Sequence, residues 1–157
     1  MSELAFLSPD RGEAPLASPL ARVLRGQARV RDLSLLGKIE VRGDVDAIDA
    51  PEAEVVRITD RRALVLCPYE RCAELRATLP GFVVDMTGAL AGLEVQGEQV
   101  VRRLTDLDLD ALPAVGAVAR VQAVVSRDGE RFRIFVPQEL GHYVAEVVLD
   151  ALDGIAS

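Results

Sequence analysis

Two short segments of this chain place a hydroxyl two residues after a carboxylate, at the end of an apolar stretch. They contain Asp32 with Ser34, and Asp85 with Thr87. A hydroxyl becomes a nucleophile only beside a base and an oxyanion hole, and the neighbouring residues supply neither. We therefore expect Ser34 and Thr87 to hydrogen-bond their turns, and we predict no catalytic residue. A carboxylate that ends an apolar strand must find donors, so Asp32 and Asp85 are expected to stabilise the turns or to contact a ligand or partner.

The residues that commonly bind metals do not combine into a metal site. His142 is the only histidine, and no cluster of acids or cysteines accompanies it in the sequence. With one histidine and two cysteines, a closed zinc site would also need carboxylates. Free cysteines are commonly small buried hydrophobic residues, and we expect this role for Cys67 and Cys72. The sequence thus predicts no metal, and a surface or packing role for His142.

Two further patterns resemble ligand-binding motifs but differ from them in detail. Asp106, Asp108 and Asp110 have the spacing that opens a calcium-binding loop, yet large leucines separate them, and the glycine and glutamate of such a loop are missing. These leucines are expected to point into the core. The glycines within residues 88–97 do not have the spacing of a dinucleotide-binding fingerprint. Neither pattern therefore predicts a ligand.

Composition excludes several classes of function. The chain has 157 residues and a formal net charge of −7, and Lys38 is its only lysine. A nucleic-acid-binding protein usually shows a basic face, and none is visible in this sequence. No apolar run approaches the roughly 20 residues of a membrane helix, and the N-terminus lacks the basic and apolar regions of a secretory signal. We expect a cytoplasmic protein that binds neither nucleic acid nor membrane.

The segments around the two carboxylate–hydroxyl pairs repeat one another. Residues 30–43, VRDLSLLGKIEVRG, and residues 83–97, VVDMTGALAGLEVQG, share an Asp, a hydroxyl residue, Glu-Val and a final Gly. Each is followed by an apolar strand, a proline and an amphipathic helix. We therefore predict one domain with a pseudo-twofold internal repeat. The predicted boundaries are an extended or mobile arm over residues 1–17, and a domain over 18–157 made of half-repeats 28–81 and 82–154.

Hydrophobic periodicity predicts an α+β fold in which helices pack on antiparallel sheet. Strands are expected at 28–33, 38–42, 55–58, 63–66, 118–126 and 130–136, with two more inside 83–97. Helices are expected at 18–26, 68–79, 98–106 and 138–152. In the strand over 38–42, Ile39 and Val41 alternate with Lys38, Glu40 and Arg42. This alternation predicts that the polar side chains lie on an exposed face.

The repeated Asp-Leu-Ser and G-x-(I/L)-E-V-x-G pattern resembles the folate-binding aminomethyltransferase superfamily, which includes the glycine-cleavage T protein. Within it, the sequence is most similar to the gamma subunit of heterotetrameric sarcosine oxidase. The similarity runs over about residues 18–153, through SPLARVL at 18–24, the two repeated segments, and FRIFVPQELGHYVAEVVLDAL at 132–152. The resemblance implies the fold of an aminomethyltransferase folate-binding domain.

The resemblance also implies a function. A gamma subunit carries no flavin, NAD or zinc of its own and packs against the large folate-binding subunit, while FAD, FMN and NAD belong to partner chains. Such a complex demethylates sarcosine to glycine and passes the one-carbon unit to tetrahydrofolate. The acidic hairpin of catalytic aminomethyltransferases is missing here, because residues 118–125 read VARVQAVV. We therefore expect a non-catalytic subunit of a sarcosine-oxidase-type complex.

Two alternatives stay open at this point. The chain could be a stand-alone tetrahydrofolate-binding one-carbon protein, with Asp32 or Asp85 near the pterin, although its scarce aromatics disfavour this reading. It could also be a ligand-free scaffold of the same fold that associates with itself, since a fold does not fix a function. Co-purification of partner subunits, binding of folate, or self-association distinguishes the three readings of the function.

Overall fold

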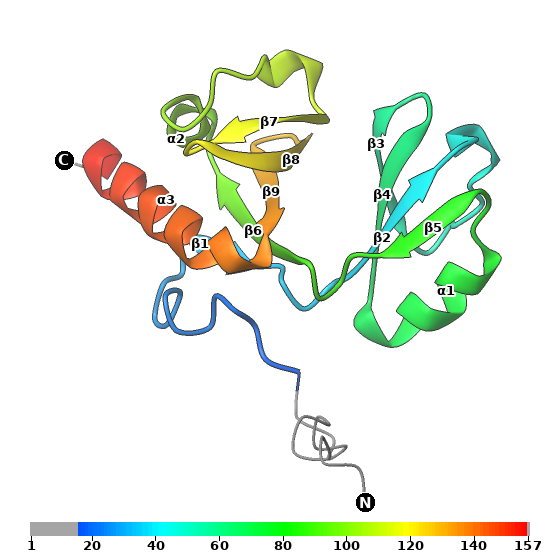
Figure 1. Ribbon diagram of the computed structural model, residues 1–157. Coiled ribbons are helices and arrows are strands. Elements are labelled where there is room, and N and C mark those ends of the chain that lie inside the picture. Colours follow the sequence, from blue (N-terminus) through cyan, green and yellow to red (C-terminus); the bar gives the residue numbers. More distant parts are fainter. Residues whose placement is uncertain (1–15, 157) are drawn as a thin grey trace, which may run out of the picture.

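Two antiparallel sheets, each with a helix on its outer face, make up the computed structural model, which describes residues 16–156 (Figure 1). This confirms the predicted α+β class with antiparallel sheet. Of the predicted arm, only Leu16 and Ala17 fall within the described residues. The division into two half-repeats stays a prediction.

The five-stranded sheet has the order β1-β6-β9-β8-β7, and the four-stranded sheet has the order β3-β4-β2-β5. Their strands are β1 (Val30–Asp32), β2 (Gly37–Arg42), β3 (Glu54–Thr59), β4 (Arg62–Cys67), β5 (Phe82–Asp85), β6 (Leu90–Gln96), β7 (Ala114–Val118), β8 (Val121–Asp128) and β9 (Arg131–Pro137). The hairpin of β8 and β9 was predicted from its Asp-Gly turn, which tight hairpins favour. The segment that forms β7 was expected to be loop.

Within residues 16–156, three α-helices accompany the strands. They are α1 (Cys72–Thr78), α2 (Glu98–Arg102) and α3 (Gly141–Ala156). Single turns of 3-10 helix lead into α1 and α3, at Tyr69–Arg71 and Gln138–Leu140, directly after a proline in each case. The predicted helices at 68–79 and 138–152 are thus confirmed, whereas the one at 98–106 is shorter than expected.

The predicted helix over residues 18–26 is wrong. Residues 19–26 form turns, with a single helical hydrogen bond from Leu24 N–H to Leu20 O at 2.9 Å. One turn of helix costs more conformational entropy than its few hydrogen bonds return, and Gly26 then reverses the chain with φ +75°. Leu20 and Leu24 are nevertheless buried in the core. Their periodicity reflects two anchoring side chains and not a helix.

Clusters of buried apolar side chains hold the layers together. Phe132 and Val148 belong to the cluster between the five-stranded sheet and α3. Leu64 and Phe135 belong to a cluster that joins the two sheets, and Val65 to a cluster between the four-stranded sheet and α1. Successive side chains of a strand point to opposite faces, so Leu64 and Val65 serve different layers. The order of layers is helix, sheet, sheet, helix.

This layering corrects the prediction of an exposed polar face on β2. Lys38 is fully buried and Glu40 is 5% exposed, because the face opposite Ile39 and Val41 is covered by the other sheet. Glu40 accepts a hydrogen bond from Arg62 Nη2 at 3.0 Å. Burial raises the pKa of the Glu40 carboxyl, but hydrogen bonds from Arg62 and Arg42 outweigh it, and the net pKa is lowered. A strand with two buried faces can alternate apolar and charged residues when each charged group finds hydrogen-bond partners.

One guanidinium links the two sheets. Arg133 on β9 donates from Nε to Glu94 Oε2 of β6 at 2.9 Å, and also pairs with Glu54 at the start of β3 in the other sheet. Burial lowers the pKa of Arg133, and its bonds to Glu94 and Glu54 raise it above the ordinary value. The ion pair complements the apolar cluster between the sheets.

Candidate functional site

The two carboxylate–hydroxyl pairs lie where the chain crosses from one sheet to the other. Residues 33–36 link β1 of the five-stranded sheet to β2 of the four-stranded sheet, and residues 86–89 link β5 back to β6. Figure 1 shows the two linkers passing each other below the sheets. Because β1 pairs with β6 and β2 pairs with β5, neither linker closes a hairpin. The sequence did not reveal this exchange of strands.

The first linker is fixed by Asp32, which bonds its own turn as predicted, and by Ser34, whose hydroxyl was expected to bond that turn but reaches another strand. Asp32 Oδ1 accepts the N–H of Ser34 at 2.9 Å, and Asp32 Oδ2 accepts the hydroxyl of Ser18. Ser34 Oγ accepts the N–H of Gly92 at 3.2 Å. The N–H of Leu33 donates to Gly92 O at 2.8 Å. Both oxygens of Asp32 are thus used within the protein.

The second linker repeats these bonds with the roles of the strands exchanged. Asp85 Oδ1 accepts the N–H of Thr87 at 2.9 Å, and Thr87 Oγ1 accepts the N–H of Lys38 at 3.0 Å. The N–H of Met86 donates to Lys38 O at 2.8 Å. Each hydroxyl therefore satisfies a backbone donor of the strand that begins after the opposite linker.

Lys38 is the polar residue at this crossing that sequence analysis missed. Its Nζ donates to Ser34 O at 2.7 Å and to Leu36 O at 2.8 Å, so the ammonium fastens β2 to the preceding linker. Burial lowers the pKa of this ammonium to about 8, partly offset by the charges of Asp32 and Asp85. The available signal was that the only lysine of the chain occupies the position where the second segment has Gly92.

A pocket of about 550 Å³ opens beside the crossing. Three of the four predicted residues, Ser34, Asp85 and Thr87, line it, and Asp32 does not. The remaining lining residues are Leu16, Ala17, Pro19, Leu35, Tyr69, Gly88, Ala89, Leu90 and Gln138. We call this the crossover pocket. It has the mixture of apolar walls and a few polar groups that is typical of a ligand or partner site.

Asp85 is the charged group of the crossover pocket. Burial raises the pKa of its carboxyl, but hydrogen bonds from Thr87 and the charges of Arg76 and Lys38 outweigh it and lower the net pKa. Arg76 Nη1 lies 3.6 Å from Asp85 Oδ2, and 40% of the Asp85 side chain is exposed. An ionised, half-exposed carboxylate can accept hydrogen bonds from a bound molecule without leaving the turn.

The other candidates for chemistry lie apart or are held within the protein. Both cysteines are free and buried, and burial together with the adjacent Cys72 raises the pKa of the Cys67 thiol to about 11, which disfavours the reactive thiolate. His142 is exposed on α3, where its Nε2 lies 3.1 Å from Glu146 Oε1. Asp108 accepts the N–H of Asp110 in a local turn. Within residues 16–156, no cluster of His, Cys, Asp or Glu is arranged to hold a metal, and no helix is long and apolar enough to span a membrane.

Removing the Thr87 hydroxyl is expected to destabilise the crossing. In Thr87→Val the N–H of Lys38 loses its acceptor in a buried layer, which costs about 1–2 kcal/mol of unfolding free energy. Ser34→Ala should behave alike, because Gly92 N–H then loses Ser34 Oγ. Urea unfolding measures both, with Thr87→Ser as the control that retains the oxygen. Equal stability of Thr87→Val and Thr87→Ser would contradict this role.

Comparisons with known proteins give similarity at the level of the fold. No protein family and no curated protein sequence matches the chain. Among solved structures, a chain of the heterotetrameric sarcosine oxidase from Corynebacterium sp. U-96, solved with pyrrole 2-carboxylate, matches with a TM-score of 0.71 and 13% identity. The match covers 90% of this chain and 97% of that one. This chain therefore has a fold like that of a sarcosine oxidase subunit.

A weaker match is the ligand-free regulatory subunit of aspartate kinase from Thermus thermophilus. Its TM-score is 0.47 at 11% identity, and the match covers 78% of this chain and 96% of that one.

Proposed function

We propose that this chain is a non-catalytic, gamma-type subunit of a heteromeric sarcosine-oxidase-type complex. The observation that carries the proposal is the match to a chain of heterotetrameric sarcosine oxidase, which extends over nearly the whole of both chains. In such a complex the oxidative demethylation of sarcosine is done by partner chains, which would also hold FAD, FMN and NAD. This chain would belong to the folate-binding aminomethyltransferase superfamily. It would pack against the folate-binding large subunit of the complex.

The surface around the crossover pocket supports a role in association. Leu16, Leu35 and Tyr69 line the pocket and are 50%, 43% and 47% exposed. Leu140 is also exposed, two residues from the lining residue Gln138. Exposed apolar side chains that gather at one place commonly mark a protein interface, and a tyrosine among them is a frequent anchor. We infer that this surface faces the partner subunit.

Co-expression with the sarcosine-oxidase-type subunits of the same host tests the proposal. We expect a tagged form of the chain to recover flavin-bearing partners, and Tyr69→Asp to reduce that recovery at least about tenfold, because it buries a charge at the interface. Phe82→Asp is the matched control, since Phe82 is a 65% exposed aromatic at the opposite end of β5 from Asp85. Recovery of the chain alone would contradict the proposal, and equal losses in both variants would contradict the assigned surface.

A stand-alone tetrahydrofolate-binding protein is the second candidate, and the crossover pocket favours it. An ionised Asp85 beside the Ser34 and Thr87 hydroxyls could accept hydrogen bonds from the pterin donor edge, against the apolar wall of Leu35 and Leu90. Titration calorimetry with tetrahydrofolate measures this, and Asp85→Asn should weaken any binding. Absence of heat, together with a homo-oligomer by light scattering, would instead support a self-associating scaffold.

A further inference from the structure

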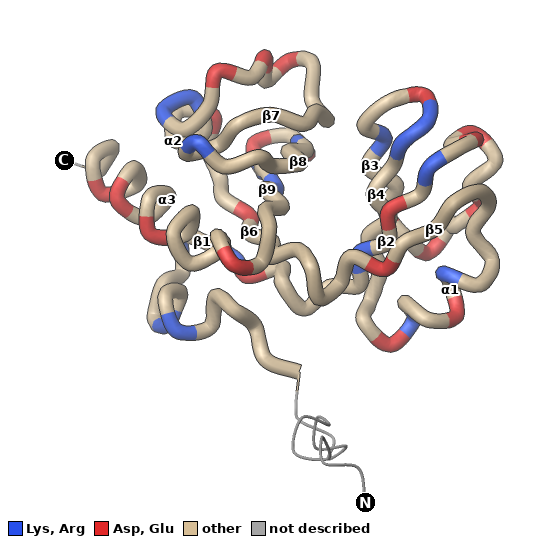
Figure 2. The backbone as a smooth tube through the Cα atoms, viewed as in Figure 1, with Lys and Arg blue, Asp and Glu red and all other residues tan. Residues whose placement is uncertain are grey.

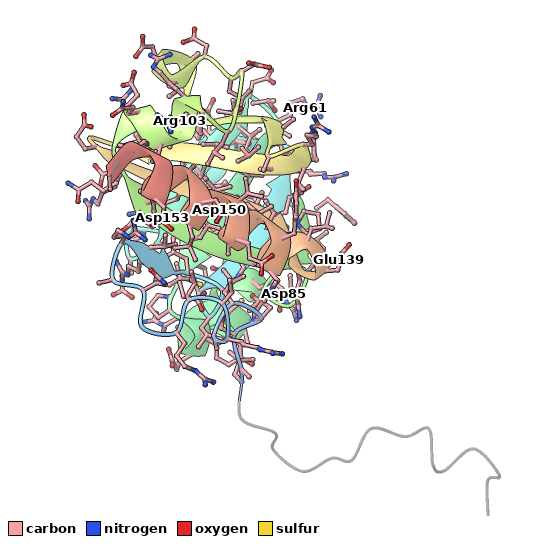
Figure 3. All side chains as sticks on the ribbon, turned by 90° about the vertical axis from the view of Figure 1, so that its left-hand side faces the viewer. Arg61, Asp85, Arg103, Glu139, Asp150 and Asp153 are labelled. Atoms are coloured by element: carbon pink, nitrogen blue, oxygen red, sulfur yellow. The ribbon has the colours of Figure 1, made fainter. Side chains whose placement is uncertain are left out.

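A second pocket, of about 380 Å³, lies where the end of α2, the β7–β8 turn and α3 meet. Arg102, Arg103 and Thr105 line it from the α2 side, Arg120 from the turn, and Tyr143 from α3. In Figure 3, Arg103 and Asp85 lie toward opposite ends of the molecule, with α3 between them. This pocket, which we call the arginine pocket, is therefore separate from the crossover pocket.

The arginine pocket carries an excess of positive charge, because three arginines and one carboxylate, that of Asp106, line it. Most of the described arginines form ion pairs, and Arg102 itself bonds to Glu98 Oε1 at 2.7 Å. Arg103 and Arg120, in contrast, form no ion pair with any carboxylate in residues 16–156, and both line this one pocket. Figure 2 shows basic segments at α2, and others at β3 and β4 on the opposite side of the molecule. In a protein of net charge −7, two arginines without a described carboxylate partner at one cavity favour an anion there.

The backbone holds the two sides of the pocket in a fixed relation. The N–H of Ala119 donates to Leu104 O at 2.8 Å, and the hydroxyl of Thr105 donates to Ala117 O at 2.6 Å. These bonds tie the β7–β8 turn to the segment after α2. Ala119 and Arg120 have φ of 49° and 67°, a left-handed conformation that residues other than glycine rarely adopt. The backbone of Arg103 and of Arg120 thus reaches the pocket from elements that are hydrogen-bonded to each other.

We propose that the arginine pocket binds the phosphate group of a small hydroxylated phosphomonoester. Guanidinium groups match phosphate oxygens with two parallel hydrogen bonds, and the half-exposed Tyr143, which also lines the pocket, can supply a further donor. Asp106 also lines the pocket, and its carboxylate can accept a hydroxyl of the remaining part of the ligand. The volume lies within the range of small-ligand pockets. This role is independent of the proposed subunit function.

Amide NMR of the full chain, titrated with inorganic phosphate and with glycerol 3-phosphate at constant ionic strength, tests the assignment. We expect saturable shifts at residues 103–105 and 119–120, with glycerol 3-phosphate binding more tightly than phosphate. Arg120→Ala and Arg103→Ala should each weaken binding about tenfold or more, while Arg120→Lys retains part of it. Arg61→Ala is the matched control, since Arg61 is another arginine without an ion pair in the described residues, on the β3–β4 turn.

Each other outcome overturns the proposal. Shifts that do not saturate, or that are the same in Arg61→Ala and Arg120→Ala, would show an adventitious ion only. If both pocket variants keep the phosphate response but recover less partner subunit in co-purification, the arginines belong to a protein interface and the ligand assignment is wrong. Well-dispersed amide spectra of the variants show that a loss of binding does not come from unfolding.

Discussion

Replacing Lys38 with alanine is expected to lower the free energy of unfolding by about 3 kcal/mol, from the combined loss of two hydrogen bonds and of buried volume. The side chain is fully buried, and its Nζ donates to Ser34 O and Leu36 O at 2.7 and 2.8 Å. Without it, the carbonyls of the first linker lose their donor where the chain passes between sheets. Urea unfolding of the variant measures the loss.

Lys38→Met separates packing from hydrogen bonding at the same position. Methionine keeps most of the aliphatic volume and removes the ammonium, so we expect about half the loss seen with alanine. Replacing a buried charge by an apolar side chain also removes a desolvation cost, and this limits the effect. If Lys38→Met and Lys38→Ala are equally unstable, the hydrogen bonds account for the whole contribution. If both are as stable as the parent, Lys38 does not fasten the crossing.

The pH dependence of stability provides an independent measure of Lys38. Its pKa is about 8 in the folded protein, below the ordinary lysine value of 10.5. Between these two values the unfolded chain holds the proton and the folded protein has released it, so stability rises with pH through this window, by at most about 1.4 kcal/mol per pH unit. Below about pH 8 both states are protonated and the contribution is constant.

The comparison of parent and Lys38→Met isolates this contribution. Cys67 acts in the opposite direction, because its raised pKa of about 11 keeps the thiol protonated in the folded state after the unfolded chain has ionised. This effect is present in both proteins and cancels in their difference. We expect the parent to gain stability over Lys38→Met from about pH 8 upward, as measured by urea unfolding under reducing conditions. A difference that does not change with pH would contradict a lowered pKa for Lys38.

Gly81→Ala is expected to destabilise the protein by at least about 3 kcal/mol, since it combines backbone strain with a steric clash. Gly81 leads into β5 with φ +79°, and a Cβ there would lie 2.5 Å from the backbone oxygen of Arg42. The chain passes this close because β5 pairs with the end of β2. Relief would require the edge strand to move away from its partner.

Two other glycines separate the causes of this loss. Gly26 has a similar φ of +75°, but a Cβ there would meet nothing within 4 Å, so Gly26→Ala should cost only about 1 kcal/mol from strain. Gly88→Ala, with open space and no positive φ, should be close to neutral. Thermal and urea unfolding of the three variants measures the differences. Equal losses in Gly81→Ala and Gly26→Ala would show that the contact with Arg42 contributes nothing.

The sequence determined the elements whose signals are local. The amphipathic period of residues 138–152 predicted α3, the Asp-Gly turn predicted the β8–β9 hairpin, and prolines marked the entry to the helices at 68–79 and 138–152. The position of Asp32 and Asp85 at strand ends predicted carboxylates that bond their own turns. These outcomes depend on residues close in the chain, which is why they could be read from it.

The tertiary structure alone decided which face of β2 is covered by the other sheet. Alternation along residues 38–42 indicated an exposed face, but a second sheet packs there and buries Lys38 and Glu40. The same packing turned two apparent strand–turn–strand units into crossings between sheets, and thereby brought Ser34, Asp85 and Thr87 to one pocket. Strand pairing joins residues more than fifty positions apart, and periodicity within one strand carries no information about its partner. That pairing determines which groups are buried, which charged groups lie close together and which side chains are exposed to a ligand.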